Sequence, residues 1–372
     1  MVGSLIQLPF FLSLHKIVKE RFKALTGLRA VAAIMVFLYH NRKYWRGWLP
    51  GFIIQNLNEF HTGVTLFFVL SGFLIAYTYQ DEPMQSAKQY VKYLLIRLLR
   101  IFPVYLIILT ISYCNNGFPA TNLAIYNYTL LKGLSDRFNL EGLPQSWSLT
   151  VELSFYFFAP LIYAYLKQNY YKAIGLLLVL LSVALLIGYG WHYYNGNHDR
   201  WLYNWLFIFD STFFGRFFEF FAGMLLAHWL LTRRGEVGGI RNLTLMSGIL
   251  SLIVIYGISL FEVDVYDQGT QHIAGLLLRN LLLPLLFCAF IYGLMTEETW
   301  LSKLLSTKLA MLLGDASYIF YLVHIGYVNR KLYNYQPLHD RNFIFLWLIS
   351  IAGYLLIEKP LYNFCKQKIR SF

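Results

Sequence analysis

The sequence predicts an all-α, polytopic membrane protein with about ten transmembrane helices. Of its 372 residues, 58% are apolar and only 13% are charged, and the mean hydropathy is positive. A soluble protein of this length cannot bury so much apolar surface, so the bilayer is the expected solvent. Aromatic residues make up 19% of the chain, which suits a protein with many helix ends at the membrane interface.

A helix needs about 20 mostly apolar residues to cross the hydrocarbon core. The sequence contains ten such segments, at 24–41, 61–79, 99–115, 147–166, 173–191, 206–231, 240–261, 272–295, 310–329 and 342–358. Each is expected to be helical, because hydrocarbon offers no partner for unpaired backbone groups. We therefore expect an N-terminal cytoplasmic or interfacial segment (1–23), a ten-helix transmembrane domain (24–358) and a basic cytoplasmic C-terminal tail (359–372).

Two stretches outside the ten segments are expected at the membrane surface or outside the membrane. The apolar run from Leu5 to Leu14 has no basic residue before it and no small-residue cleavage site after it, so we interpret it as an interfacial helix and not as a cleaved signal. The longest loop, about 116–146, is the only sizeable piece expected outside the membrane.

Basic residues are distributed unequally along the ten-helix path. Of the 31 Lys and Arg residues, 19 fall on one side and 9 on the other. Short basic loops stay in the cytoplasm, so both termini are expected to be cytoplasmic. The net charge of +12 is scattered between apolar segments, which argues against a nucleic-acid partner. The three cysteines are widely separated, so neither a disulfide framework nor a metal site is expected.

The first helix carries two ionisable residues, Arg29 and His40. A charged group inside a helix costs about 2.5 to 3.5 kcal/mol on insertion scales, so each is a functional candidate. Their spacing of eleven residues places them on one helical face, about 16 Å apart along the axis. The alternatives are that His40 meets headgroups at the helix end and that Arg29 snorkels to the cytoplasmic interface.

The fourth helix begins near Trp147 and carries Glu152 about one turn inside the outer surface. This is the depth expected for His40, so the two side chains could pair. The alternative is that Glu152 pairs with a basic residue and holds helices together.

For the other polar residues inside the helices, either a structural role is favoured or a structural and a functional role both remain open. Arg216 and Glu219 are three residues apart, and an intrahelical pair is the favoured interpretation. Close helix packing is favoured for Ser71 and Gly72. A polar stripe that could line a cavity is formed in the ninth helix by Ser317, Tyr318, Tyr321 and His324.

A basic run precedes the third helix, with Lys88, Lys92, Arg97 and Arg100 before Pro103. Such cations usually bind anionic headgroups, worth about 1 kcal/mol each. The same run could instead receive the phosphates of a nucleotide-bearing donor, since Arg forms bidentate bonds with phosphate.

Short motifs along nearly the whole chain resemble the acyltransferase-3 family, membrane O-acyltransferases that modify bacterial surface polysaccharides. In chain order they are Leu25–Ala33 with His40, Phe67–Ile75, Arg97–Arg100 leading into Ile101–Tyr105, Ser146–Leu149 with Glu152 and Phe155–Tyr156, Arg216 with Glu219–Phe220 and Gly223–Met224, Ser317–Leu322 with His324, and Glu358–Pro360. Each motif alone is weak, but seven in order make chance similarity improbable.

The resemblance implies a reaction and a set of residues. His40 would act as general base or transient acyl acceptor, Glu152 would orient it, and Arg29 would contact the donor or the oxyanion. The donor would be acetyl-CoA or a related acyl-CoA, with no bound cofactor and no metal, and the acceptor a carbohydrate or glycolipid at the bacterial cytoplasmic (inner) membrane. The chain looks like the stand-alone form, without the fused esterase-like domain of many relatives. Substrate contacts are expected from Arg97, Arg100, Ser71, Trp147, Arg216, Tyr318 and His324.

Two other functions remain open. A carrier or flippase for a lipid-linked glycan would also place charges inside the membrane, although no inverted repeat is visible. A structural or partner-binding membrane subunit is the second alternative.

Overall fold

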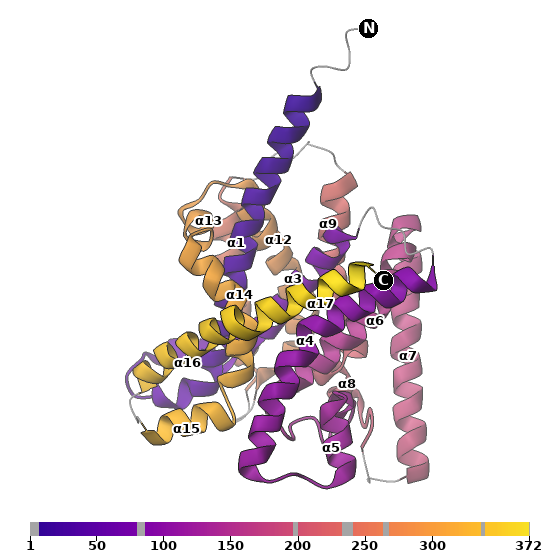
Figure 1. Ribbon diagram of the computed structural model, residues 1–372, viewed down its shortest axis with the longest axis vertical. Helices are drawn as coiled ribbons and strands as arrows, with labels where there is room; N and C mark the ends of the chain where they lie inside the picture. Colours follow the sequence, from indigo (N-terminus) through magenta and orange to yellow (C-terminus); the bar gives the residue numbers. More distant parts are fainter. Residues whose placement is uncertain are drawn as a thin grey trace.

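The computed structural model describes residues 7–79, 86–195, 200–232, 241–262, 268–335 and 339–371, and most of these are helical (Figure 1). The helices of 14 or more residues are α1 (Gln7–Asn41), α3 (Gly63–Thr78), α4 (Ala87–Asn116), α6 (Trp147–Gln168), α7 (Tyr170–Asn195), α9 (Phe213–Thr232), α10 (Leu243–Ser259), α12 (Leu283–Thr296), α14 (Lys308–Val323) and α16 (His339–Gly353). The shorter ones are α2 (Gly51–Asn58), α5 (Thr121–Tyr128), α8 (Trp205–Ser211), α11 (Ile273–Leu277), α13 (Trp300–Leu305), α15 (Tyr327–Tyr335) and α17 (Lys359–Ser371).

The predicted all-α, polytopic membrane fold is confirmed. Eight helical stretches in the described part are long and apolar enough to cross a bilayer: 22–44, 60–78, 87–116, 144–168, 170–194, 205–232, 273–296 and 342–369. The other two predicted segments form shorter helices, α10 with 17 residues and α14 with 16. The segment predicted at 310–329 ends earlier than expected, because α14 stops at Val323.

Both ends of the chain are more helical than the sequence suggested. From Gln7 onward, the segment predicted as a separate interfacial helix is part of the continuous helix α1, while Leu5 and Ile6 lie outside the described residues. At the other end, Lys359–Ser371 forms α17, which follows a π-helical turn (Tyr354–Glu358) and packs on α4 (Figure 1).

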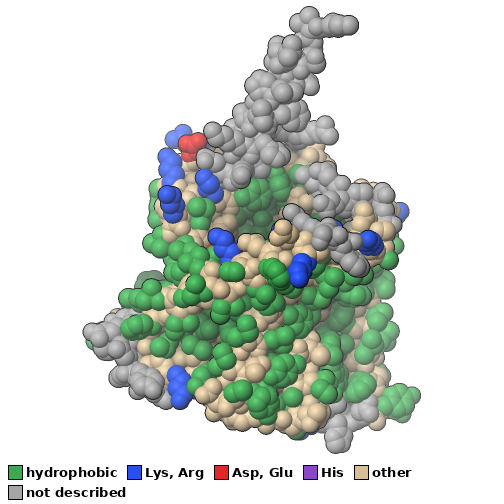
Figure 2. Space-filling view, viewed as in Figure 1, with side chains coloured by type: hydrophobic (Ala, Val, Ile, Leu, Met, Phe, Trp, Pro, Cys, Tyr) green, Lys and Arg blue, Asp and Glu red, His purple; other side chains and the backbone are tan. Residues whose placement is uncertain are grey.

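The surface of the molecule fits a lipid environment. Large apolar side chains point outward, among them Leu186 (70% exposed) on α7 and Ile253 (56%) on α10. Figure 2 shows a broad hydrophobic face, with most of the visible Lys and Arg side chains gathered toward the end from which α1 projects. Such an arrangement is typical of a helical bundle with one basic membrane interface.

Several helix pairs approach each other closely enough to require glycine, among them α3 with α9 and α14 with α1. On α3, a Cβ at Gly72 would lie 2.0 Å from the carbonyl oxygen of Phe220 on α9. On α14, a Cβ at Gly314 would lie 1.8 Å from the carbonyl oxygen of Thr26 on α1. Small residues allow such backbone approach in membrane bundles, so the predicted packing role of Gly72 is confirmed.

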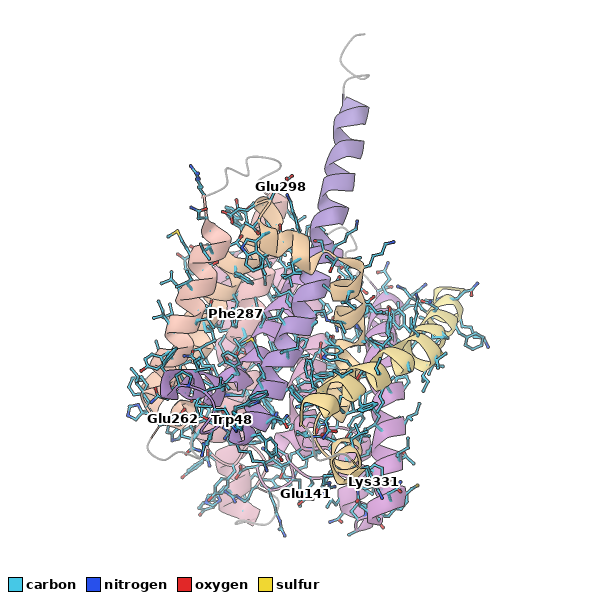
Figure 3. All side chains as sticks on the ribbon, turned by 90° about the vertical axis from the view of Figure 1, so that its left-hand side faces the viewer. Trp48, Glu141, Glu262, Phe287, Glu298 and Lys331 are labelled. Carbon is cyan, nitrogen blue, oxygen red and sulfur yellow. The ribbon has the colours of Figure 1, made fainter. Side chains whose placement is uncertain are left out.

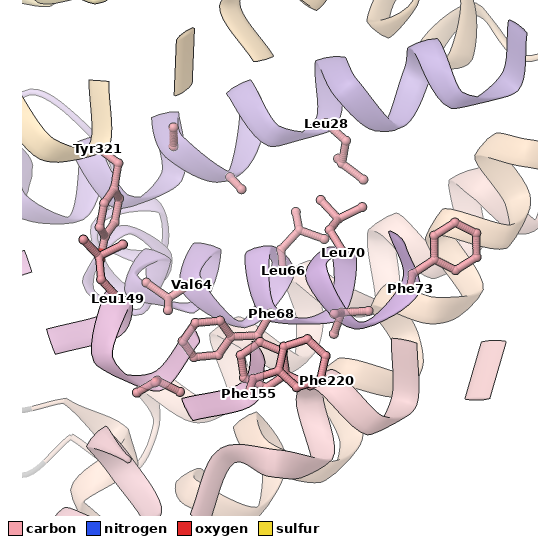
Figure 4. Close-up of a cluster of buried hydrophobic side chains, with 14 of the residues drawn as sticks. Leu28, Val64, Leu66, Phe68, Leu70, Phe73, Leu149, Phe155, Phe220 and Tyr321 are labelled. Carbon is pink, nitrogen blue, oxygen red and sulfur yellow. The ribbon is translucent and has the colours of Figure 1, made fainter. Parts of the chain in front are cut away.

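A stack of aromatic rings joins α3, α6 and α9 (Figure 4). The ring centroid of Phe220 lies 4.5 Å from that of Phe68 and 4.2 Å from that of Phe155. Offset ring pairs of this kind stabilise beyond the area they bury, by about 0.5 to 1.5 kcal/mol each. The stack therefore fixes the positions of α3 and α6, which carry Ser71 and Glu152.

Figure 3 shows which residues lie at opposite ends of the bundle. Glu298, between α12 and α13, lies at the end from which α1 projects, whereas Glu141 and Lys331 lie at the other end. This agrees with the sides to which the ten-helix path assigns these three residues. The loop at 116–146 is not irregular, since it contains α5 and two short 3₁₀ helices, Leu131–Leu134 and Pro144–Ser146.

Candidate active site

Two histidines from opposite ends of the sequence meet at one site. His40 lies in the last turn of α1, and His324 is the residue that ends α14. His40 Nδ1 lies 3.1 Å from His324 Nε2, and His324 is only 1% exposed. The chain turns sharply after His324, where Gly326 has a φ of 86° that favours glycine.

The hydrogen bonds of the two rings assign their protons. His40 Nδ1 lies 2.9 Å from the carbonyl oxygen of Val36, and His324 Nδ1 lies 2.7 Å from that of Tyr321. A carbonyl only accepts, so each Nδ1 carries the hydrogen. His324 Nε2 is then an acceptor that shares the Nδ1–H of His40. His40 Nε2 is left unprotonated, and no described residue donates a hydrogen bond to it.

A polar cavity of about 260 Å³ lies between α1, α3, α4, α6 and α14. Neither histidine lines this cavity, but Tyr321 does, and its ring centroid lies 5.4 Å from that of His324. Six of the sequence-predicted site residues line this cavity, together with Thr78, Ser148, Tyr156 and Tyr321; the six are Arg29, Ser71, Arg97, Arg100, Glu152 and Tyr318.

Three of the lining residues are arginines. None of them forms a salt bridge with a carboxylate of the described residues. The guanidinium of Arg97 instead lies among tyrosine rings, 5.1 Å from the ring centroid of Tyr79 and 5.6 Å from that of Tyr156. The cavity thus offers cations that an anionic ligand can approach.

Glu152 is held by hydroxyl groups and not by His40. Its Oε1 accepts hydrogen bonds from Ser71 Oγ at 2.9 Å and from the hydroxyl of Tyr156. The pairing of Glu152 with His40 expected from sequence is therefore not present. Glu152 instead lines the cavity that Arg29 lines, and His40 is not among the lining residues of that cavity. Ser71, for which close helix packing was the favoured interpretation, also donates the hydrogen bond to Glu152.

Arg216 and Trp147 lie outside the lining of the cavity. Arg216 is 1% exposed and forms the predicted intrahelical pair, with its Nη2 2.8 Å from Glu219 Oε1. The same nitrogen donates to Thr65 Oγ1 at 3.0 Å, and the guanidinium lies 5.5 Å from the ring centroid of Trp147. The structural interpretation of Arg216 is confirmed, and these contacts join α9 to α3 and α6.

Tyr318 and Tyr321 are both fixed by their hydroxyl groups. Tyr318 donates to the carbonyl oxygen of Ile101 at 2.6 Å, and the Tyr321 hydroxyl lies 2.7 Å from Ser148 Oγ. Their rings therefore form a rigid wall from the arginines to the histidines. Among the described residues no group of three His, Cys, Asp or Glu side chains could hold a metal ion.

Sequence analysis missed a buried lysine beside the site. Lys132, in the loop at 116–146, is fully buried, and its Nζ donates to the carbonyl oxygens of Leu143, at 2.8 Å, and Glu141. Burial lowers the pKa of Lys132 to about 7. The segment that it holds leads to Gln145, whose carbonyl oxygen accepts from the Tyr321 hydroxyl at 3.0 Å. A lysine in a polar loop gives no sequence signal of burial.

The acyltransferase-3 family model, described as an acyltransferase domain, matches residues 22–359. Among curated proteins, the chain is 23% identical over 382 residues to O-acetyltransferase OatA of Staphylococcus aureus strain NCTC 8325, covering 97% of this chain and 59% of that protein. It is 22% identical over 376 residues to a protein of S. aureus strain COL named "Putative O-acetyltransferase", covering 93% of this chain and 57% of that protein.

The chain therefore spans less than two thirds of the length of these two relatives. No solved structure matches it significantly. The family model nevertheless covers nearly all of the described helices, including both histidines, Glu152 and the three arginines of the cavity. The chain belongs to the acyltransferase-3 family.

Proposed function

We propose that this protein is a membrane O-acyltransferase that moves an acyl group, most simply acetyl, from a cytosolic acyl-CoA to a hydroxyl of a surface polysaccharide or lipid-linked glycan. The observation that carries the proposal is the unprotonated Nε2 of His40, next to a cavity with three arginines that lack a carboxylate partner among the described residues. The family and the printed names of the relatives support the reaction class.

The cavity suits the donor because its charge is the opposite of that of a CoA ester. Arg97 and Arg100 lie on α4, and Arg29 lies on α1, all on the same cavity. Arginine binds phosphate with two parallel hydrogen bonds and is always charged. The diphosphate of the donor would lie at these arginines, with the pantetheine arm directed along Tyr318 and Tyr321 toward the histidines.

The chemical step uses the lone pair of His40 Nε2. In direct transfer, Nε2 removes the proton of the acceptor hydroxyl while its oxygen attacks the thioester carbonyl. A C–O bond forms, the C–S bond breaks, and CoA leaves as a thiolate that takes up one proton. In a relay, Nε2 itself attacks the thioester first, so that an N–C bond forms, the C–S bond breaks and the CoA thiolate leaves. The hydroxyl then attacks the acyl-imidazole, the N–C bond breaks, and the proton of the hydroxyl passes to the CoA thiolate. Both routes begin from the same unprotonated nitrogen.

His324 takes the positioning role that the family resemblance implied for Glu152. Its Nε2 accepts the Nδ1–H of His40 and would stabilise the imidazolium that forms when His40 takes a proton. Glu152, held by Ser71 and Tyr156, would place one negative charge opposite the three arginines and so offset part of their positive charge.

The proposed setting is the bacterial cytoplasmic membrane, with both termini and the donor on the cytoplasmic side. The more basic end visible in Figure 2 supports this orientation. The acceptor would then approach His40 from the opposite side, where His40 and the loop at 116–146 lie.

Purified protein in liposomes distinguishes transfer from transport. An acyltransferase releases free CoA thiol from acetyl-CoA when an acceptor glycan is added, and mass spectrometry finds one acetyl group more on the glycan. A carrier moves a labelled glycolipid between leaflets without releasing thiol. Glycolipid movement with no thiol release from the wild-type protein would overturn the proposal. Comparing the surface glycans of cells with and without the gene then identifies the acceptor.

A further inference from the structure

A second and larger cavity lies beside the cavity that Arg29, Arg97 and Arg100 line, which is called the donor cavity below. This cleft, of about 730 Å³, opens between the end of α3, the start of α4 and the second half of α6. Aromatic rings form much of its wall, and one cation lies at the end of α6; these residues are Tyr79, Tyr90, Tyr93, Phe157, Tyr163 and Lys167.

Arg97 joins the cleft to the donor cavity. It lines the donor cavity, while its guanidinium lies 5.1 Å and 5.7 Å from the ring centroids of Tyr79 and Tyr93, which line the cleft. Ile75 lines both spaces. A ligand with its anionic part at Arg97 can therefore extend one arm into the donor cavity and another into the aromatic cleft.

The hydroxyl of Tyr93 is a buried polar group on the wall of the cleft. Tyr93 is 3% exposed, and its hydroxyl lies near the guanidinium of Arg97 but forms no hydrogen bond of regular geometry with the described residues. Buried hydroxyl groups are nearly always hydrogen-bonded in native proteins, so this one points to a ligand with a polar atom. A hydrocarbon chain would leave it unsatisfied.

We propose that the cleft binds the 3′-phosphoadenosine end of the acyl-CoA donor. The adenine ring would lie against the tyrosine rings and hydrogen-bond to the Tyr93 hydroxyl, the diphosphate would lie at Arg97, and the 3′-phosphate would lie at Lys167. Flat rings and nucleobases stack well, and a heterocycle with ring nitrogens and an amino group can both accept from and donate to a hydroxyl. This inference rests on the proposed use of an acyl-CoA donor.

A series of truncated donors tests each contact. The donors are acetyl-CoA, its 3′-dephospho form and S-acetyl-4′-phosphopantetheine, which lacks the nucleotide. We expect Lys167→Gln to raise the KM for acetyl-CoA about tenfold, as for a lost charged hydrogen bond, and to leave the KM for the dephospho form nearly as it was. Tyr93→Phe should raise the KM about fivefold for both nucleotide donors and not for acetyl-phosphopantetheine.

Two variants serve as matched controls. Lys172→Gln and Tyr170→Phe change the same residue types at the adjacent start of α7, away from the cleft, and should alter no KM. Equal KM increases for all three donors, or no increase for any, would overturn the cleft assignment. A response of the cleft variants to phospholipid composition alone would assign the cleft to a lipid instead.

Direct binding of adenosine 3′,5′-bisphosphate separates this inference from the proposed function. We expect saturable binding to the wild-type protein that Lys167→Gln and Tyr93→Phe weaken. Such binding without any acyl transfer would keep the cleft assignment and end the proposed function. Acyl transfer by a protein that does not bind the bisphosphate would keep the proposed function and end the cleft assignment.

Discussion

The two histidines show how single residues acquire a chemical state from their neighbours. Each Nδ1 faces a carbonyl of its own helix, so each ring is held in one tautomer. His40 keeps a free basic nitrogen, and His324 keeps an acceptor for the proton of His40. Backbone carbonyls four and three residues away thus determine which nitrogen carries the hydrogen in His40 and in His324.

Replacing His324 by Gln should slow transfer without ending it. The His324 ring positions His40 and does not itself reach the acceptor hydroxyl in this proposal, so we expect kcat to fall about 10- to 100-fold with little change in donor KM. The pH profile of kcat should also shift, because the imidazolium of His40 loses its partner. A fall in donor affinity with an unchanged pH profile would instead place His324 in the donor site.

The arginines on α4 should act mainly on donor binding. Replacing Arg97 and Arg100 by Gln removes cations that hold the donor in both the ground state and the transition state, so the donor KM should rise more than kcat falls. Steady-state kinetics over a range of acetyl-CoA concentrations measure both. If the well-folded variant has an unchanged KM for acetyl-CoA, this basic run binds anionic lipid headgroups and not the donor.

Much of the cavity could be predicted from single residues, because polar groups inside a membrane helix are costly and therefore stand out. Arg29 and Glu152 were found in this way, and both line one cavity; Ser71, for which packing was favoured, lines it too. The partner of His40 could not be found, since His324 lies 284 positions further along the chain and local spacing says nothing about such contacts. The catalytic and substrate-binding roles of these residues stay predictions.

At the scale of elements, the site depends on how helix ends are held. The 3₁₀ helix Pro144–Ser146 runs directly into α6, and the carbonyl oxygen of Gln145 accepts from Tyr321 on α14. The buried Lys132 holds the chain just before it. A loop outside the membrane thus connects to the rings next to His324.

Lys132 makes the stability of this loop depend on pH. Its pKa is near 7 in the fold and about 10.4 in an unfolded chain. The folded state therefore binds fewer protons than the unfolded state between these values, and stability should rise with pH from about 7 to about 10. Over this pH range the thermal unfolding midpoint of the wild type should rise relative to that of Lys132→Met.

The control is Lys172→Met, an exposed lysine at the start of α7. Its thermal midpoint should follow the wild type at every pH. A difference between wild type and Lys132→Met that stays constant with pH would show that Lys132 keeps its charge when buried.

Element boundaries were predictable where apolar length decides them and not where tertiary contacts do. The stretches near 61–79 and 147–166 match α3 and α6 closely. By contrast, α14 ends at Val323 because the chain must turn at Gly326, and the basic C-terminal stretch is helical because α17 packs on α4. Neither packing partner is visible in the local sequence.

At the scale of the whole molecule, the path of ten membrane segments predicts on which side of the membrane each loop lies. Glu298 lies at the end from which α1 projects, and Glu141 and Lys331 lie at the other (Figure 3). A single cysteine at position 298 should react only with membrane-permeant reagents, whereas a cysteine at 141 or 331 should also react with impermeant reagents added outside. Labelling of 298 and 331 from the same side would contradict the ten-crossing path.

The whole bundle also separates the two ends of the reaction. Arg29 and His40 are eleven residues apart on α1, or about 16 Å along its axis. In the proposed reaction the donor would bridge this distance, entering at one end while the acceptor is activated at the other. Substitutions at the two positions should fail in different ways if this separation is real.

The most direct test measures acetyl-CoA binding and acetyl transfer side by side for His40→Ala and Arg29→Ala, after both variants are shown to insert and fold. His40→Ala should bind acetyl-CoA almost as the wild type does but transfer nothing, because the base is needed only for the chemical step. Arg29→Ala should lose donor affinity, by about tenfold or more, together with turnover. A His40→Ala protein that transfers acetyl at the wild-type rate would contradict the account.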